Sequence, residues 1–187
     1  MFEKKIVLAS KSPRRVELIK DLGFDFRVVY TDVDEVYPPN MSPFKIPGFL
    51  ARLKSKAVKE IADDEILLTA DTMVYLGSEV LGKPADEKEA RKTLKALSGN
   101  MHTVITGVCL KTKKKTKTFS VRTKVYFNNL TDDEINYYIK NGNPFDKAGS
   151  YGIQEWIGFV AVNKIVGSYT NIVGLPMERV WAEVGKF

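Results

Sequence analysis

The sequence contains only one cysteine and one histidine among its 187 residues. A single cysteine, Cys109, excludes an intrachain disulfide and a zinc site made of cysteines alone, and its apolar neighbours favour a place in the core. The single histidine, His102, stands near the start of an expected strand, where a structural role is the more common one. We therefore expect neither a disulfide framework nor Ser-His-Asp or Cys-His catalysis.

Long apolar runs and repeats are also missing. No stretch approaches the ~18 apolar residues of a membrane span, and residues 1–10 are interrupted too soon for a signal peptide. No linker or low-complexity tract divides the chain. A domain of about 150 residues buries roughly 70% of its unfolded surface, so residues 1–187 can form one domain, or two lobes that share one core. We expect a cytoplasmic protein with no membrane partner.

The charge balance is basic, with 29 Lys and Arg against 23 Asp and Glu, for a net charge of +6. Such a balance raises the possibility of a nucleic-acid partner. Five lysines, however, lie in residues 111–118, which contain no acid, so the rest of the chain carries only +1. Lysine and threonine between two β segments are typical of a solvated turn that protects a sheet edge. We therefore expect no nucleic-acid partner.

Strand and helix patterns alternate along the chain, which predicts an α/β fold. Strands are expected at residues 5–10, 24–30, 66–70, 103–110, 119–127 and 159–166. Helices are expected at residues 13–22, 47–62, 86–97, 131–140 and 176–184. Their starts carry recognisable signals: Ser12 before Pro13, Asp86 as an N-cap, and a Thr131-to-Glu134 capping box.

Two arginines, Arg14 and Arg15, stand in the first turn of the first expected helix. Cations are disfavoured at this positive end of the helix dipole, where backbone N–H groups are unpaired. The arrangement is favourable if an anion binds there, held by the N–H groups, the hydroxyls of Ser10 and Ser12, and the guanidinium groups. The alternative is a pair of solvated arginines.

Carboxylates form the second candidate group. Asp71 follows an apolar strand, and a charge in such a place must be paired, hydrogen-bonded or bound to a metal, unless it simply starts a turn. Asp32, Asp34 and Glu35 form an acidic cluster whose oxygen ligands suit Mg²⁺ or Mn²⁺. Most clusters of this kind are solvated loop residues, so the cluster alone decides little.

Two further residues suit a nucleotide. Lys83 is held on a restricted backbone before Pro84 and can meet a phosphate as a point charge, although a surface lysine in a turn is the simpler alternative. Gln154 ends a glycine-containing loop over residues 144–154, in which the backbone can approach a ligand closely. Its carboxamide offers a donor and an acceptor that match the O4 and N3–H edge of uracil or thymine.

Five blocks, in order along nearly the whole chain, resemble the Maf family of nucleoside triphosphate pyrophosphatases. The blocks are Leu8-Ala-Ser-x-Ser-Pro-Arg-Arg15, Ala70-Asp-Thr72 with Leu81-Gly-Lys-Pro84, Ser98-Gly-x-x-His102-x-Val104, Asp146-Lys-Ala-Gly-Ser-Tyr-Gly-Ile-Gln154, and Gly167-Ser-Tyr-x-Asn171-x-Val-Gly-Leu-Pro176. The resemblance implies a mixed, curved sheet with flanking helices and two lobes around a central cleft, as in inosine triphosphate pyrophosphatases.

The same resemblance implies hydrolysis of a nucleoside triphosphate to the monophosphate and pyrophosphate with a divalent cation, Mg²⁺ or Mn²⁺. The family's substrate-binding positions fall on Ser10, Arg14, Arg15, Lys54, Lys83 and Gln154. Its catalytic position falls on Asp71, and its metal ligands on Glu35 and Asp71. Lys54 rests on the pattern Leu50-Ala-x-x-Lys54, after which this chain has Ser55 where the family usually has alanine.

The segment Tyr151-Gly-Ile-Gln154 resembles the branch of the family that acts on dTTP and UTP. The resemblance also implies a homodimer and a house-cleaning role in nucleotide metabolism. Whether Asp71 deprotonates the attacking water or binds the metal stays open at this stage. Three other functions also stay open: a non-catalytic nucleotide-binding module, a nucleic-acid-binding protein, and a phosphohydrolase that releases orthophosphate.

Overall fold

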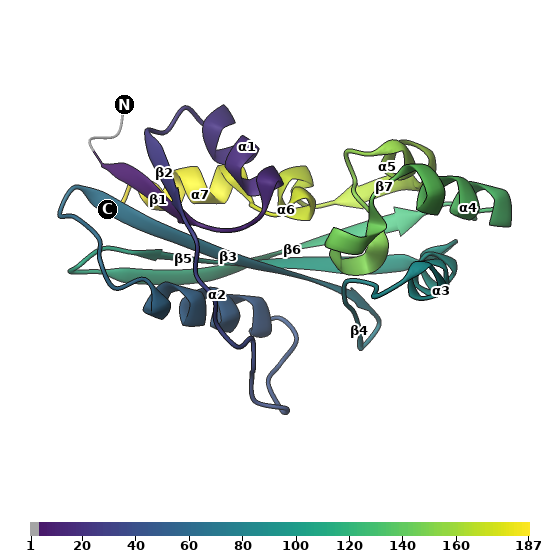
Figure 1. The fold of residues 1–187 in the computed structure, drawn as a ribbon, viewed down its shortest axis with the longest axis horizontal. Helices are drawn as coiled ribbons and strands as arrows, with labels where there is room; N and C mark the ends of the chain where they lie inside the picture. The colour runs from purple at the N-terminus through teal and green to yellow at the C-terminus, as the bar shows by residue number, and fades with distance from the viewer. Residues whose placement is uncertain (1–3) are drawn as a thin grey trace. The chain divides into compact units, whose positions relative to one another are not determined.

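A computed structural model describes residues 4–187, which form a mixed sheet flanked by helices (Figure 1). The strands are β1 (Lys5–Ala9), β2 (Phe26–Val29), β3 (Glu65–Leu76), β4 (Glu79–Leu81), β5 (Met101–Lys111), β6 (Thr116–Phe127) and β7 (Val162–Val166). The α-helices are α1 (Pro13–Asp21), α2 (Ile46–Ala57), α3 (Glu87–Leu97), α4 (Asp132–Asn141), α5 (Trp156–Ala161), α6 (Tyr169–Val173) and α7 (Met177–Val184). Two short 3₁₀ turns, η1 (Pro144–Asp146) and η2 (Ala148–Ser150), precede α5.

The sheet contains both parallel and antiparallel pairs. Its order over the described residues is β2-β1-β3-β5-β6-β7, and β4 pairs with β3 outside this path. Strand β1 runs parallel to β2 and β3, whereas β4 is antiparallel to β3 and β7 is antiparallel to β6. The expected mixed α/β fold is therefore confirmed.

The chain forms two compact units. The first contains the chain up to Asp71, Thr106–Val121 and Gly174–Phe187, and the second contains Thr72–Ile105 and Arg122–Val173. The chain passes from one unit to the other within β3, β5 and β6. The single domain expected from the sequence remains a prediction.

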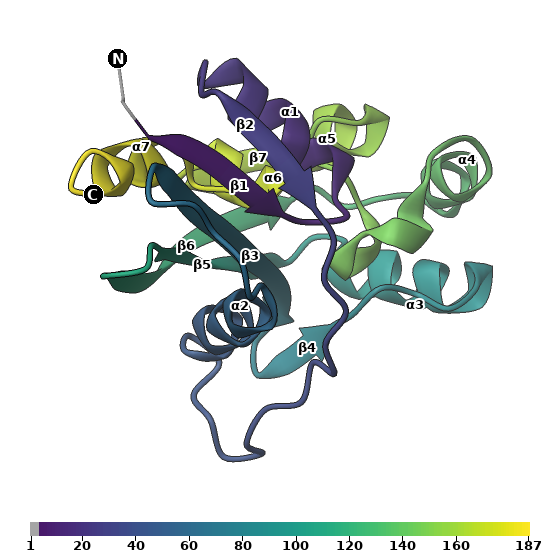
Figure 2. The same cartoon turned by 60° about the vertical axis from the view of Figure 1, so that its left-hand side comes forward.

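In the first unit, helices cover both faces of the strands. Helix α2 lies on one face, and α1 and α7 lie on the other (Figure 1, Figure 2). Alternate residues of β1 explain this arrangement: Ile6 and Leu8 pack with the α1 and α7 side, while Val7 and Ala9 pack with Ile61 and Leu67. A strand buried on both faces reads as a continuous apolar run, as residues 6–9 do.

Helix α2 approaches β5 backbone to backbone. A Cβ built on Gly107 would lie 2.1 Å from the backbone N of Gly48 and 2.1 Å from the carbonyl carbon of Pro47. The hydroxyl of Thr69 in β3 also donates a 2.6 Å hydrogen bond to the backbone carbonyl of Ala51. These contacts fix the position of α2 on the sheet.

The second unit has its own core and an aromatic cluster at its centre. His102, Phe127 and Tyr151 form edge-to-face pairs with ring centroids 5.0 to 5.3 Å apart, and His102 Nε2 lies 2.7 Å from the hydroxyl of Tyr151. His102 is fully buried. This buried position fits the structural role that the sequence analysis expects for His102. In the first unit, Cys109 is also buried, as expected.

Most element boundaries agree with the sequence analysis, and the capping box of Thr131 and Glu134 is present. Three expectations were wrong. The helix expected to reach residue 62 ends at Ala57, because Val58 is extended and packs with the small cluster around Ile61. The strand expected to end near Asp71 continues to Leu76. Residues 159–161 are helical, since α5 begins at Trp156.

Four short elements have no counterpart in the sequence analysis, namely β4, η1, η2 and α6. The side chain of Ser12, the expected N-cap of α1, makes no capping hydrogen bond, and the backbone N–H of Ser12 donates to the hydroxyl of Ser10 instead. No helix within residues 4–187 is long and apolar enough to cross a membrane.

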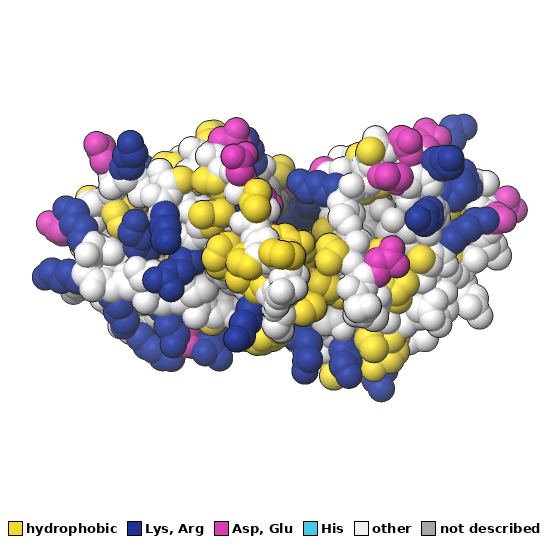
Figure 3. Space-filling model, turned by 90° about the horizontal axis from the view of Figure 1, so that it is seen from below, with side chains coloured by type: hydrophobic (Ala, Val, Ile, Leu, Met, Phe, Trp, Pro, Cys, Tyr) yellow, Lys and Arg dark blue, Asp and Glu magenta, His cyan; other side chains and the backbone are white. Residues whose placement is uncertain are grey.

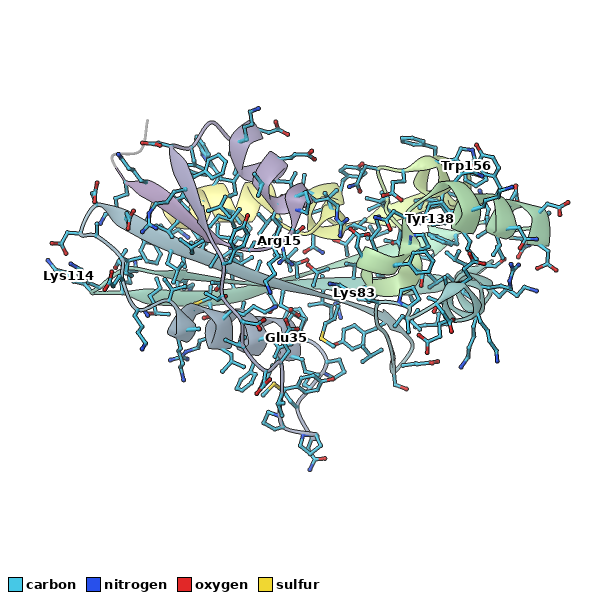
Figure 4. The ribbon with its side chains drawn as sticks, in the orientation of Figure 1. Arg15, Glu35, Lys83, Lys114, Tyr138 and Trp156 are labelled. Carbon is cyan, nitrogen blue, oxygen red and sulfur yellow. The ribbon has the colours of Figure 1, made fainter. Side chains whose placement is uncertain are left out.

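The lysine-rich segment forms the turn between β5 and β6. Figure 4 shows Lys114 at the far end of the first unit from Arg15 and Glu35. The turn is tied down as well as solvated: Lys113 pairs with Asp63 at 3.1 Å, and Lys115 donates to the backbone carbonyl of Lys186. Figure 3 shows further Lys and Arg side chains over the same unit. The excess charge of this turn therefore lies away from Arg15 and Glu35.

We predict that Gly107→Ala lowers the free energy of unfolding by at least about 3 kcal/mol, because the added methyl group meets the backbone of α2 and neither backbone can yield cheaply. Gly82→Ala is the matched control, since a Cβ at Gly82 meets nothing within 4 Å. Urea unfolding of both variants checks this. A Gly107→Ala stability equal to that of Gly82→Ala would contradict the close packing.

The buried histidine predicts a pH dependence of stability. Burial lowers the pKa of His102 to about 4, so between that value and its ordinary pKa near 6.5 the unfolded chain binds the proton better than the folded chain does. The contribution of this group to stability is complete above about pH 6.5 and is lost as the pH falls, by about 2 to 3 kcal/mol at pH 4.5. The His102→Gln variant should lose this part of the dependence. Parallel pH slopes in urea unfolding of the two proteins would contradict it.

Candidate active site

The first unit brings Lys54 between two carboxylates. Its ammonium lies 2.6 Å from Oδ1 of Asp71 and 2.9 Å from Oε1 of Glu35. The side chains of Lys54 and Asp71 are only 16% and 10% exposed, whereas Glu35 is 53% exposed. Asp71 is thus paired, as a charge within a buried strand must be. Because the charge is satisfied in place, β3 continues through Asp71 instead of turning there.

Three separate elements supply this cluster. Lys54 comes from α2, which the Gly107 contact fixes on the sheet. Asp71 comes from the middle of β3. Glu35 comes from the irregular segment after β2, and Figure 4 shows it together with Arg15 in this unit.

Arg15 holds the backbone beside Asp71. Its Nε donates to the backbone carbonyl of Gly174 at 3.0 Å, and an Nη donates to the carbonyl of Ala70 at 2.9 Å. Burial lowers the pKa of Arg15, and the nearby negative charge of Asp71 opposes that effect. The guanidinium group therefore joins α1, β3 and the segment before α7 at one point, next to the Asp71 carboxylate.

The start of α1 lies at the end of β1. Ala9 is in register with Thr69 of β3, so Ser10 follows at the level of Ala70. Ser10 is 8% exposed, and the capping position of α1 is not closed by the side chain of Ser12. Arg14 and Arg15 follow in the first turn. The backbone amides at the start of α1 and the two arginines therefore lie together, which favours the binding of an anion there.

The acidic cluster of the sequence divides in the structure. Only Glu35 contacts Lys54, while Asp32 pairs with Lys11 at 3.3 Å through side chains that are largely exposed. The backbone carbonyl of Asp34 accepts a 2.9 Å hydrogen bond from the N–H of Val36. Within the part of the chain that the structure describes, no group of three or more His, Cys, Asp or Glu is arranged to hold a metal ion.

Six of the eight candidate residues therefore belong to the first unit: Ser10, Arg14, Arg15, Glu35, Lys54 and Asp71. Ser55, which departs from the family pattern, is buried, and its hydroxyl donates to the carbonyl of Arg52 and lies 3.4 Å from Cys109 Sγ. The hydroxyl is accommodated without displacing Lys54.

The other two candidates, Lys83 and Gln154, belong to the second unit. Lys83 is exposed in the loop between β4 and α3, where the carbonyl of Gly82 accepts a 3.1 Å hydrogen bond from the N–H of Gly149. Gln154 is partly buried in the turn between η2 and α5. The loop that carries Gln154 is therefore tied both to the Lys83 loop and, through Tyr151, to His102.

Sequence reasoning missed the groups that support these residues. The carbonyls of Ala70 and Gly174 orient Arg15, and no side-chain pattern marks a backbone carbonyl. Gly107 carried a signal that could have been used, because a glycine inside an apolar strand indicates a close backbone approach.

The comparisons with known proteins match nearly the whole chain. The family model described as "Maf-like protein" matches residues 5–187. A protein of Parabacteroides distasonis named "dTTP/UTP pyrophosphatase" is 51% identical over 185 residues, which cover 98% of this chain and 96% of that protein. A protein of Flavobacterium psychrophilum with the same name is 49% identical over 178 residues, covering 95% and 91%.

Solved structures resemble the fold. The Ham1 protein of Staphylococcus aureus matches with a TM-score of 0.52 and 18% identity, covering 96% of this chain and 100% of that one. The HAM1 protein of Coxiella burnetii matches with a TM-score of 0.50 and 15% identity, covering 98% and 100%. At these identities the likeness concerns the fold alone. The family match covers nearly the whole sequence and the relatives are about half identical, so this chain belongs to the Maf family.

Proposed function

We propose that this chain hydrolyses dTTP and UTP to the monophosphate and pyrophosphate. The observation that carries the proposal is the Asp71, Lys54 and Glu35 cluster beside an arginine-bearing helix start. That arrangement offers positive charge for a triphosphate and a buried carboxylate for a water molecule. Two relatives that share about half of this sequence are named "dTTP/UTP pyrophosphatase".

A divalent cation fits the donor set, with Glu35 and Asp71 as its proposed ligands. Their carboxylates converge on the single positive charge of Lys54, so the place already suits a cation. Mg²⁺ commonly takes one or two carboxylates and completes its shell with substrate phosphates and water, so the lack of a third acid is no obstacle. When bound, Mg²⁺ or Mn²⁺ would supply neutralisation of the triphosphate charge.

Asp71 is the proposed catalytic residue. Its carboxylate, held by Lys54, would orient the water and accept its proton as the oxygen attacks the α-phosphorus. Negative charge then grows on the departing pyrophosphate. Arg14, Arg15 and Lys83 would stabilise that charge, and Ser10 and Lys54 would complete the contacts to the phosphates. The side chain of Arg15 is already held by two backbone carbonyls, so it needs little reorganisation when the charge develops.

Gln154 is the proposed base-reading residue. Its carboxamide can donate to O4 and accept from N3–H of uracil or thymine. We also propose, following the family resemblance, that the chain folds as one domain, acts in the cytoplasm as a homodimer, and has no nucleic-acid partner.

The proposed function is tested by measuring pyrophosphate and orthophosphate separately, with each canonical and modified nucleoside triphosphate and Mg²⁺ or Mn²⁺. We expect pyrophosphate release that is greatest with dTTP and UTP. Release of orthophosphate alone would identify a different phosphohydrolase, and binding without release of either product would identify a non-catalytic module.

Asp71→Asn should lower the turnover of UTP by about 10² to 10⁴-fold, the usual contribution of a general base. Asp32→Asn is the matched control, because Asp32 is an exposed acid whose ion-pair partner is Lys11 and not Lys54. Its turnover should equal that of the unaltered protein. Near-normal turnover of Asp71→Asn with retained metal binding would show that Asp71 is not the base.

A further inference from the structure

A buried lysine organises the loop before Gln154. Lys147 is 4% exposed, and its ammonium contacts the carbonyl of Asn143, Oδ1 of Asp146 at 2.7 Å and Oε1 of Glu155 at 2.7 Å. An ammonium group has three donors. Each of the three donors has an acceptor here, so the ammonium of Lys147 joins the start of the loop, at Asn143 and Asp146, to its end at Glu155.

The other oxygen of Glu155 continues the network. Oε2 accepts a 2.5 Å hydrogen bond from the hydroxyl of Tyr138, and that hydroxyl accepts a 3.2 Å hydrogen bond from the backbone N–H of Gly152. Tyr138 is 1% exposed, on α4. The network therefore contacts both sides of Gln154: the backbone of Gly152 before it and the side chain of Glu155 after it.

The backbone beside Gln154 is closely packed at two glycines. A Cβ on Gly152 would lie 2.7 Å from Cδ of Glu155 and 2.9 Å from Cε of Lys147. A Cβ on Gly158 would lie 1.9 Å from the carbonyl oxygen of Ile153. The backbone at Gly152 and Ile153 is therefore packed against the network on one side and α5 on the other.

Such rigidity matters for a glutamine that reads a base. Rotation of its terminal amide by half a turn exchanges the donor and the acceptor, so a mobile glutamine satisfies cytosine as well as uracil. Discrimination requires that the side chain be held so that only one arrangement meets the base. Ion pairs to a buried ammonium are also a poor source of net stability, since apolar side chains of similar volume often serve as well.

We propose that Lys147, Glu155 and Tyr138 are positioning residues that make Gln154 selective for uracil and thymine over cytosine. The proposal rests on the proposed function. The three residues act on Gln154 through the loop backbone, because the ammonium of Lys147 and both carboxylate oxygens of Glu155 are engaged within the network.

Tyr138→Phe tests the proposal because it removes one hydroxyl and keeps the ring. Tyr137→Phe is the matched control: Tyr137 is the neighbouring residue of α4, is 52% exposed, and contacts Trp156 by its ring (Figure 4 labels Tyr138 and Trp156). Two quantities are measured for each variant: amide hydrogen exchange over residues 152–154, and kcat/KM for UTP and for CTP.

For Tyr138→Phe we expect exchange over residues 152–154 to be at least about tenfold faster and the UTP to CTP ratio of kcat/KM to fall at least about tenfold, mainly through a lower KM for CTP. The kcat for UTP should stay within about twofold of the unaltered protein, and Tyr137→Phe should change neither quantity. Glu155→Gln, which keeps the shape of the side chain and removes its charge, should shift both quantities in the same direction.

Unchanged exchange in Tyr138→Phe would overturn the proposal, as would faster exchange with an unchanged nucleotide ratio. If the unaltered protein cleaves UTP and CTP equally well, or cleaves neither, the base selectivity or the proposed function itself has failed. Those outcomes are seen before any variant is compared, so the two kinds of failure are distinguishable.

Discussion

The ammonium of Lys54, placed between the carboxylates of Asp71 and Glu35, is the interaction on which the first unit depends. Asp71 lies within a strand that is buried along most of its length, and an isolated charge there would cost several kcal/mol. Its pairing with Lys54 lets β3 continue as a regular strand. Because an ion pair this buried adds little net stability compared with apolar packing, its presence is better explained by chemistry that needs a carboxylate and a cation at one point.

The rest of the first unit keeps that pair in place. Gly107 lets α2 approach β5 closely enough to bring Lys54 to β3, and Arg15 ties the carbonyl of Ala70, next to Asp71, to α1 and to Gly174. The second unit uses the same device at Gln154, where the buried ammonium of Lys147 pairs with the partly buried Glu155 and Tyr138 extends their hydrogen bonds to the backbone. In both units buried charges fix a short segment that carries a proposed functional side chain.

Local signals in the sequence predicted much of this structure. The N-cap Asp86 and the capping box at Thr131 predicted helices close to α3 and α4, because caps are local properties. The pairing of Asp71 could be expected from burial, but its partner could not, since Lys54 is 17 residues away in the sequence and reaches Asp71 only through the packing of α2. For the same reason the roles of Tyr138 and of the Gly174 carbonyl were not predictable: each is defined by a tertiary contact. The helix at Trp156–Ala161 was missed because its apolar residues also suit a strand.

The central claim is that Asp71 and Glu35 mark a cation site that serves a bound triphosphate. It is tested most directly by the affinity of Mn²⁺ for the complex with an α,β-imido analogue of UTP, followed by electron paramagnetic resonance. The account predicts that Asp71→Asn and Glu35→Gln each weaken this affinity at least about tenfold, since each removes a charged oxygen ligand, while Asp32→Asn leaves it unchanged. Equal Mn²⁺ affinity in all of these proteins would contradict the account.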